Sequence, residues 1–229
     1  MNVVALMPVK GFRQAKQRLS PVLSCAARGL LAEAMFCDVL HQVKLARGLA
    51  GTFVVTGDAK VAAIASNAGA EVIREKAENG ETAAVDFARV ELKTAGCESV
   101  LIIPGDMPLV RANDIECVLA QVPDDLAGPF ALLVPSHDRL GTNALLLAPP
   151  DVITLRFGYG SFAFHMSQMA ARGLPVRFIE NENIALDIDE PKDLQRFLSH
   201  KLADGEATRV ARNLLAQQHV TEYPSCGDS

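Results

Sequence analysis

The sequence predicts an α/β fold: a single domain built on a mainly parallel, doubly wound sheet. Short apolar runs alternate with longer segments of helical periodicity, which is typical of strand–helix units. The chain has 229 residues, enough for one sizeable core. Hydrophobic residues make up 49% but aromatic ones only 5%, with no Trp. Because Ala, Val, Leu and Ile supply the apolar mass, we expect buried strands covered by helices on both faces.

The strands are predicted where apolar and β-branched residues run together between turn residues. Seven such runs are short enough to be strands, and one short extended piece follows them. The expected strands are Val3–Met7, Thr52–Thr56, Glu71–Arg74, Val100–Pro104, Phe130–Pro135, Ala144–Ala148 and Val176–Ile179, followed by the extended piece Ala185–Ile188.

The helices are predicted from apolar residues that recur at i, i+3 and i+4. Gly69 and Gly96 end two of them, and Pro191 opens the last one of the domain. The expected helices are Ala26–Ala46, Ala59–Asn67, Thr82–Thr94, Asn113–Gln121, Phe162–Arg172 and Pro191–Leu202. We expect the domain to span 1–203. Residues 204–229 form an extension with a helical stretch, Ala207–Gln218, and a polar, disordered end.

The composition excludes several functional classes. The net charge of −5 disfavours a nucleic-acid binder, which would need a basic surface. Five widely spaced Cys, with no pair at metal-ligand spacing, indicate free thiols rather than a disulfide framework. No apolar run reaches the roughly 18 residues of a membrane span. We therefore expect a cytoplasmic protein that binds neither membranes nor nucleic acids.

Four basic residues gather in the loop that follows the first predicted strand. Lys10, Arg13, Lys16 and Arg18 lie within nine residues that contain no acid. Cations at the carboxyl end of a strand suit a nucleoside triphosphate, whose charge must be neutralised during phosphoryl transfer. The pattern is not a Walker A loop, and a solvated basic surface loop is the other reading.

Carboxylates follow two further predicted strands. Asp106 ends the most hydrophobic strand in the run Pro104-Gly105-Asp106-Met107, where it serves as a metal ligand or as a turn residue. Asp187 and Asp189 alternate with apolar neighbours and therefore point to the same side. Hard carboxylate oxygens suit Mg²⁺, so Asp106 and Asp187 are predicted to form a metal platform. Asp189 either joins them or caps the helix that begins near Pro191.

A glycine-rich turn precedes the helix predicted at 162–172. Gly158 and Gly160 allow a close backbone approach, and Ser161 lies where the helix begins, which favours an anion site. A plain capped turn is the alternative. His165 lies one turn further on the same face, and a lone histidine in this position is more often structural than catalytic.

Five motifs together resemble one family. The runs PVKGFRQAKQRLS, PGDMPL, GTNAL, FGYGSFAFH and LDIDEPKDL, in this order, resemble the guanylyltransferases of coenzyme F420 biosynthesis. The resemblance covers residue 3 to about residue 200. It implies a glycosyltransferase-A-like nucleotidyltransferase fold. It also implies transfer of GMP from GTP to 2-phospho-L-lactate, phosphoenolpyruvate or 3-phospho-D-glycerate with release of pyrophosphate.

The resemblance assigns roles to individual residues. The catalytic residues are Lys16, Arg18 and Asp106, and Asp106 and Asp187 are the Mg²⁺ ligands. The nucleotide contacts are Pro8, Lys10, Lys16, Thr56, Asp58 and Gly80. The contacts to the phosphorylated acid are Thr142, Gly158 and Ser161. The family usually has Gly-Leu-Asn where this chain has Asn79-Gly80-Glu81, which leaves the identity of the base open. The resemblance also hints at a homodimer.

Two other functions fit parts of the pattern. A nucleotidyltransferase for a sugar phosphate or another phosphorylated small molecule would share the metal chemistry, but its first loop is usually glycine-rich rather than basic. A non-catalytic nucleotide-binding module would not need Asp106 and Asp187 together. The enzyme hypothesis therefore makes one spatial prediction, that these two carboxylates converge opposite the basic loop.

Overall fold

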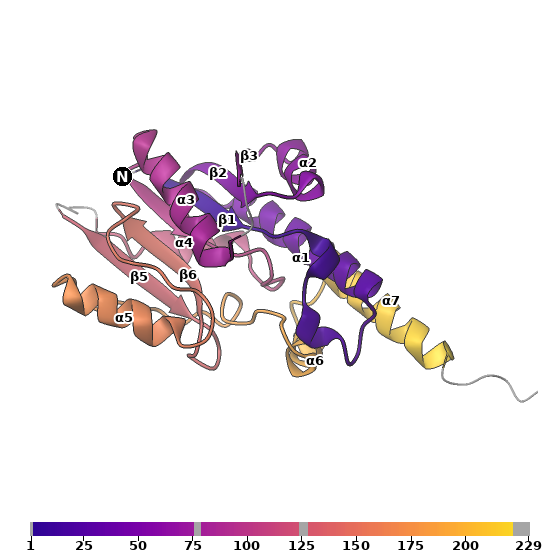
Figure 1. The fold of residues 1–229 in the computed structure, drawn as a ribbon. Coiled ribbons are helices and arrows are strands. Elements are labelled where there is room, and N and C mark those ends of the chain that lie inside the picture. The colour runs from indigo at the N-terminus through magenta and orange to yellow at the C-terminus, as the bar shows by residue number, and fades with distance from the viewer. Residues whose placement is uncertain (1, 76–78, 124–127, 222–229) are drawn as a thin grey trace, which may run out of the picture.

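A computed structural model describes residues 2–75, 79–123 and 128–221 as three layers, with a sheet between two sets of helices (Figure 1). The strands are β1 (Val3–Pro8), β2 (Leu49–Thr56), β3 (Glu71–Arg74), β4 (Ser99–Ile102), β5 (Phe130–Pro135) and β6 (Thr142–Ala148). The α-helices are α1 (Cys25–Leu45), α2 (Ala59–Asn67), α3 (Glu81–Thr94), α4 (Ala112–Leu119), α5 (Ser161–Ala171), α6 (Pro191–Ser199) and α7 (Glu206–Thr221). Two short 3₁₀ turns, η1 (Phe12–Gln14) and η2 (Gln17–Leu19), shape the first loop.

The six strands pair in the order β3-β2-β1-β4-β6-β5. The pairs β1–β2, β1–β4 and β2–β3 are parallel, whereas β6 runs antiparallel to both β4 and β5. The sheet is therefore mainly parallel, as predicted, with one reversed strand. The carboxyl ends of β1, β2 and β4 consequently meet the amino end of β6 at the same edge.

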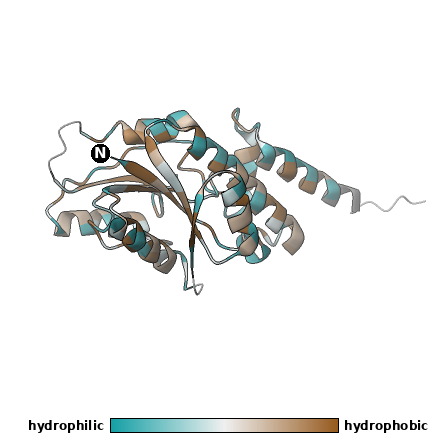
Figure 2. Ribbon diagram, turned by 90° about the horizontal axis from the view of Figure 1, so that it is seen from above, coloured by the Kyte–Doolittle hydropathy of each residue, from teal (hydrophilic) through white to brown (hydrophobic). Residues whose placement is uncertain are grey.

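Alternating residues of the strands feed two separate cores. On β1, Ala5 and Met7 pack with α1, α2, α4, α6 and α7 on one face, and Val4 and Leu6 pack with α3 and α5 on the other. Figure 2 shows the strands as the most hydrophobic ribbons, with helices of mixed character outside them. Burial on both faces explains why each central strand is a continuous apolar run rather than an alternating one.

Two predicted extended segments are not strands. Within Val176–Ile179, backbone hydrogen bonds reach only Leu133 of β5, through Arg177 O and Ile179 N, and one isolated bridge joins Leu133 to Phe178. The segment lies beside the outer edge of the sheet, and Val176 and Phe178 are 47% and 42% exposed. The prediction failed because a β-branched run at a sheet edge can pair at one point without extending a ladder. Residues 185–188 carry no strand either.

The helical extension was predicted to contain Ala207–Gln218, and α7 covers that range. It packs on α1 through Ala207 and Ala211, and Asp38 of α1 accepts hydrogen bonds from the backbone N–H groups of Glu206 and Ala207. The predicted disordered end falls mostly on 222–229, outside the described residues. The boundary between 203 and 204 stays a prediction.

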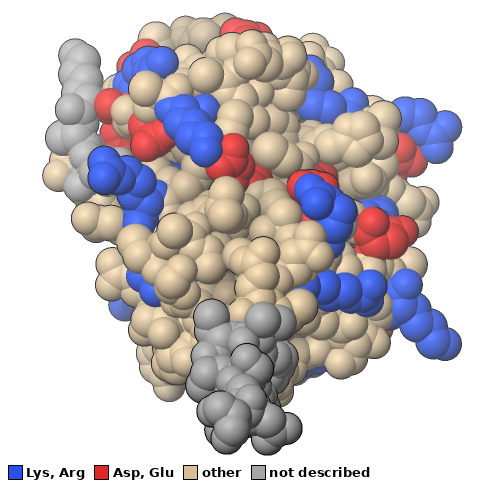
Figure 3. All heavy atoms as spheres, turned by 90° about the vertical axis from the view of Figure 1, so that its right-hand side faces the viewer, with Lys and Arg blue, Asp and Glu red and all other residues tan. Residues whose placement is uncertain are grey.

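Two surface findings bear on partners. Among the described residues, no helix is long and apolar enough to cross a membrane. Lys, Arg, Asp and Glu side chains are interspersed on the face shown in Figure 3, which has no broad basic area.

Candidate active site at the carboxyl ends of the strands

Two cavities adjoin beyond the strand ends. One has a volume of about 530 Å³ and lies over the first loop. The other has a volume of about 360 Å³ and lies against the start of β6 and of α5. Glu81, Pro104, Asp106 and Asp189 line both cavities and therefore form a shared wall. The arrangement can hold two ligands on either side of a set of carboxylates.

Lys16 of the first loop reaches this wall. The backbone there is left-handed, with φ at 52°, and buried Phe12 and Leu19 anchor the loop on either side. The Lys16 ammonium donates to Asp106 Oδ2 at 2.7 Å and to Asp189 Oδ1 at 2.8 Å. Only 9% of the Lys16 side chain is exposed. Burial by itself would lower the pKa of Lys16, but the attraction of Asp106 and Asp189 outweighs it and raises that pKa.

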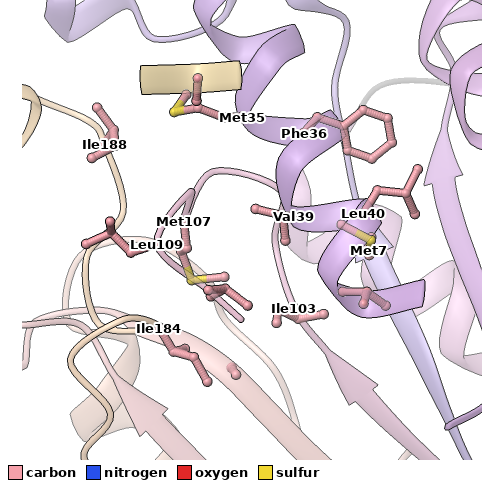
Figure 4. Close-up of a cluster of buried hydrophobic side chains, with 14 of the residues drawn as sticks. Met7, Met35, Phe36, Val39, Leu40, Ile103, Met107, Leu109, Ile184 and Ile188 are labelled. Atoms are coloured by element: carbon pink, nitrogen blue, oxygen red, sulfur yellow. The ribbon is translucent and has the colours of Figure 1, made fainter. Parts of the chain in front are cut away.

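Asp106 follows β4 on a loop held down on both sides. Ile103 and Met107 are fully buried and pack under α1 (Figure 4). Gly105 lies so close to α1 that an added Cβ would be 3.0 Å from the Phe36 ring. The Pro-Gly-Asp motif therefore has a physical reason: glycine lets the loop approach the helix, and the carboxylate that follows is presented to the cavities.

The alternation predicted for residues 186–189 is confirmed. Leu186 and Ile188 are buried, and Asp187 and Asp189 both line the second cavity. Figure 4 shows Ile188 in the apolar cluster that also holds Met107 and Leu109. The Ile188 N–H donates to Asp106 O at 3.2 Å, which ties the two aspartate-bearing segments together.

Asp189 is not the helix cap. Glu190 holds that position on α6 and forms a capping box with Asp193. The cap lies one residue later because Pro191 occupies the first turn and the Glu190 side chain can accept from the N–H of Asp193. The Asp189 carboxylate instead binds Lys16, and it also lies 3.8 Å from Arg18.

The predicted convergence of Asp106 and Asp187 is present in the fold. Both line the second cavity, and Asn143 Nδ2 donates to Asp187 Oδ1 at 3.1 Å. Burial, followed by the negative charge of Asp106, raises the pKa of Asp187 to about 6. Glu81 is affected in the same way, since burial and then Asp106 raise its pKa to about 7. The wall therefore concentrates more negative charge than Lys16 alone offsets.

The predicted nucleotide contacts divide into two groups. Pro8, Lys10, Lys16 and Gly80 line the larger cavity. Gly80 has φ at 94°, a conformation that favours glycine. Thr56 and Asp58 line neither cavity. Thr56 is buried, and Asp58 caps α2 by accepting from the backbone of Lys60 and Val61.

The predicted acid contacts all line the smaller cavity. Thr142, Gly158 and Ser161 surround it, and Arg18 lines it as well, although Arg18 was predicted on the triphosphate side. The residue before α5, Gly160, is left-handed, so Ser161 is the first helical residue rather than the cap. Ser161 is 1% exposed, and its Oγ has no hydrogen-bond partner among the described residues. A buried hydroxyl without a partner at a helix N-terminus suits an anionic ligand.

Two residues of the site had no specific signal in the sequence. Glu81 was noted only as a departure from a family pattern, yet it lines both cavities. Asn143 lies within the motif GTNAL, and it donates to Asp187, 44 positions further along the chain. The fold buries Asn143, and a buried amide needs hydrogen-bond partners, but the sequence does not show that burial.

The structure supports the non-catalytic interpretation of His165. The ring is fully buried, lies against Phe157 and Phe164, and lines neither cavity. Burial, reinforced by the charges of Arg156 and Arg89, lowers the pKa of His165 to about 4. A histidine that stays neutral and does not face the cavities cannot transfer a proton to a ligand there.

The donor set bears on whether a metal could be held. Within the described ranges, no three His, Cys, Asp or Glu side chains group closely enough to hold a metal ion by themselves. Mg²⁺, however, is usually held by one or two carboxylates together with waters and substrate phosphates. Asp106 and Asp187 are half-buried and lie close enough for the charge of Asp106 to raise the pKa of Asp187, and they fit that partial donor set.

The mainly parallel sheet with helices on both faces has the glycosyltransferase-A-like fold found among nucleotidyltransferases. A nucleotide-diphospho-sugar transferase from Desulfovibrio desulfuricans G20 superposes with a TM-score of 0.74 at 18% identity, over 95% of this chain and 98% of the other. A cytidylyltransferase from Leptospira borgpetersenii superposes with a TM-score of 0.60 at 14% identity, over 100% of both chains.

Sequence comparison then gives the family. Residues 3–224 match the family described as "Guanylyl transferase CofC like", so the chain belongs to that family and is a nucleotidyltransferase. The phosphoenolpyruvate guanylyltransferase of Rubrobacter xylanophilus is 37% identical over 86% of this chain and 93% of its own. The 3-phospho-D-glycerate guanylyltransferase of Phenylobacterium zucineum is 36% identical over 82% and 86%. The 2-phospho-L-lactate guanylyltransferase of Methanothermobacter thermautotrophicus is 32% identical over 99% and 96%.

Proposed function

We propose that the protein transfers GMP from GTP to a small phosphorylated acid in coenzyme F420 biosynthesis, with Mg²⁺, and releases pyrophosphate. The observation that carries the proposal is the position of Asp106 in the wall between the two cavities, with Asp187 beside it. Relatives named for three such acids support the substrate class, which is 2-phospho-L-lactate, phosphoenolpyruvate or 3-phospho-D-glycerate.

In this proposal the larger cavity holds the nucleotide. Lys10 and Lys16 line it and supply positive charge for the triphosphate, and Gly80 lets the backbone at the start of α3 approach closely. Asp106 and Asp187 would hold the Mg²⁺, which would supply positive charge against the negative charge of the reacting phosphates.

The smaller cavity holds the acid. The Ser161 hydroxyl, the Thr142 hydroxyl and the N-terminal end of α5 supply donors for a carboxylate or phosphate. Arg18 lines this cavity with 70% of its side chain exposed, so it can reach an anion at the entrance. The phosphate of the acid then faces the α-phosphate of GTP across the shared wall.

The chemistry is a direct displacement. A phosphate oxygen of the acid forms a bond to the α-phosphorus of GTP, the bond from that phosphorus to the β-bridging oxygen breaks, and pyrophosphate leaves. A phosphate acceptor is already ionised near neutral pH, so no residue needs to remove a proton from it. Positioning and charge compensation therefore supply most of the rate gain.

A pyrophosphate-release assay tests the proposal. Four nucleoside triphosphates are crossed with the three acids and with a sugar 1-phosphate, with Mg²⁺ or with EDTA, and each product is identified by mass. We expect product from GTP and one or more of the acids, only with the metal. Product from the sugar phosphate alone would support the second enzyme hypothesis, and GTP binding without any product would support a non-catalytic module.

Substitution of the carboxylates tests the metal role. Asp106→Asn and Asp187→Asn keep the shape of each side chain but remove the charge, so we expect kcat to fall by roughly 100-fold or more while the fold persists. Asp151→Asn is the matched control, because Asp151 pairs with Lys93 at the surface outside both cavities. Near-normal turnover of Asp106→Asn, with folding checked by circular dichroism, would refute the role of Asp106.

The cytoplasmic location and the homodimer are part of the same proposal. Both follow from the family resemblance and from the metabolic substrates of the relatives. Sedimentation of the purified chain measures its assembly state.

A further inference from the structure

His165 contacts a predicted substrate-binding residue while lying outside the cavity itself. Its Nδ1 lies 3.0 Å from the Thr142 hydroxyl oxygen, and its Nε2 lies 3.1 Å from the backbone N of Arg156. His165 is completely buried and Thr142 is 6% exposed, so neither contact is exchanged readily for water. Thr142 lines the smaller cavity.

The Arg156 contact decides which ring nitrogen carries the proton. A backbone N–H can only donate, so Nε2 must be the unprotonated nitrogen that accepts from it. A neutral imidazole then carries its single proton on Nδ1. The low pKa of His165 agrees with this, since burial and then the facing charges of Arg156 and Arg89 keep the ring neutral.

The Thr142 hydroxyl is constrained in turn. Because Nδ1–H donates to Thr142 Oγ1, the hydroxyl cannot direct its own hydrogen at the ring. No other side chain or backbone group of the described residues takes that hydrogen in a hydrogen bond. It is left for an acceptor atom in the cavity that Thr142 lines, where the Ser161 hydroxyl also lacks a partner.

We propose that His165 is a positioning residue that makes the Thr142 hydroxyl an obligate hydrogen-bond donor to the anionic acceptor substrate. The inference rests on the proposed function for the identity of that substrate, but not for the proton arrangement. A site with fixed donors favours a carboxylate or phosphate, which can only accept, over a neutral hydroxyl that could adapt to either role. His165 therefore contributes to selecting an acid without touching it.

The proton arrangement can be tested without any activity. Long-range proton–nitrogen NMR of the full chain labelled at histidine reports the tautomer of each ring, and His165→Gln identifies the relevant signal. We expect a neutral ring protonated at Nδ1 at pH 7. A ring protonated at Nε2, or at both nitrogens, would overturn the proposal, and this result is independent of whether any acid is a substrate.

The effect on binding is read from steady-state kinetics. His165→Gln offers an acceptor to the Arg156 N–H but no longer donates to Thr142, and Thr142→Val removes the hydroxyl while Thr142→Ser keeps it. We expect His165→Gln and Thr142→Val each to raise KM for the acid roughly tenfold, with KM for the nucleotide unchanged. In the double variant the two effects should not add, because they act through one hydroxyl.

Other kinetic results would distinguish a positioning role of His165 from a structural one. Independent effects in the double variant, or an equal rise in both KM values, would show a merely structural role for His165. If His165→Gln does not fold, near-normal acid KM in Thr142→Val still refutes the proposal. If the unmodified protein uses none of the three acids, the proposed function fails, while the NMR result stands by itself.

Discussion

Replacing Lys16 by Met tests the electrostatics of the shared wall most directly. Methionine keeps the apolar stem and removes the ammonium that lies 2.7 Å from Asp106 and 2.8 Å from Asp189. Removing one partner of a fully buried pair typically destabilises by about 3–5 kcal/mol. Here the two carboxylates are 31% and 41% exposed, so water compensates in part and we expect about 2 kcal/mol.

Thermal unfolding measures that loss. A destabilisation of this size lowers Tm by roughly 4–8 °C in a chain of this length. Lys93→Met is the matched control, because Lys93 pairs with Asp151 at 2.6 Å with half of its side chain exposed. That pair should contribute no more than about 1 kcal/mol. Stability of Lys16→Met within about 0.5 kcal/mol of the unmodified protein would refute the reasoning.

Mg²⁺ separates the charge effect from a packing effect. Without Lys16, the carboxylates lack their cation, so added Mg²⁺ should raise the Tm of Lys16→Met more than that of the unmodified protein. The variant should still turn over at least about 100-fold more slowly, because the triphosphate loses a buried positive charge. An equal Mg²⁺ response in both proteins would mean that Lys16 does not compensate these carboxylates.

Three further perturbations test other parts of the structure. Arg18→Ala should raise KM for the acid and not for the nucleotide, because Arg18 lines the smaller cavity. A rise in the nucleotide KM alone would mean that Arg18 contacts the triphosphate, as the sequence predicted. The pKa of His165 is lowered from 6.5 to about 4, so the stability it contributes is complete above pH 6.5 and is lost as the pH falls towards 4. Urea titrations of the unmodified protein should therefore show a loss of about 3 kcal/mol in unfolding free energy over this pH range, and His165→Gln should not show it. The same pH dependence of stability in both proteins would contradict this. Gly205→Ala places a Cβ against the Asp38 carboxylate, which the backbone N–H groups of Glu206 and Ala207 hold in place, so it should destabilise by about 1–3 kcal/mol. Gly128→Ala meets no neighbour among the described residues and should not destabilise. Equal urea midpoints for the two variants would show that the contact between α7 and Asp38 adapts freely.

Much of the fold could be predicted because its central strands are buried on both faces. Continuous apolar runs such as the one in β1 leave little choice of structure, and the predicted range Val3–Met7 differs from the observed Val3–Pro8 by one residue. Edge segments gave weaker information. Val176–Ile179 resembles a strand in composition, but it forms a single isolated bridge, between Phe178 and Leu133 of β5. Local sequence does not record how far two segments run close enough together to pair.

The candidate site was predictable where residues follow strands. Asp106 and Lys16 were placed by the rule that ligands bind beyond the carboxyl ends of parallel strands, and both line a cavity there. Their direct contact was not predicted, because it joins positions 90 apart through a left-handed turn at Lys16 itself. Nothing in the local sequence required a non-glycine residue to adopt that backbone.

The reversed direction of β6 explains why the acceptor side was harder to derive. In a parallel strand the residues that reach this edge come after the strand, whereas β6 is antiparallel to β4 and brings its first residues there. Thr142 and Asn143 are those first residues, and they contact His165 and Asp187. A rule based on strand ends alone therefore finds the nucleotide half of the site and misses the amide that holds Asp187. Because β6 is reversed, its first residues, Thr142 and Asn143, lie beside Asp106, which follows the end of the parallel strand β4.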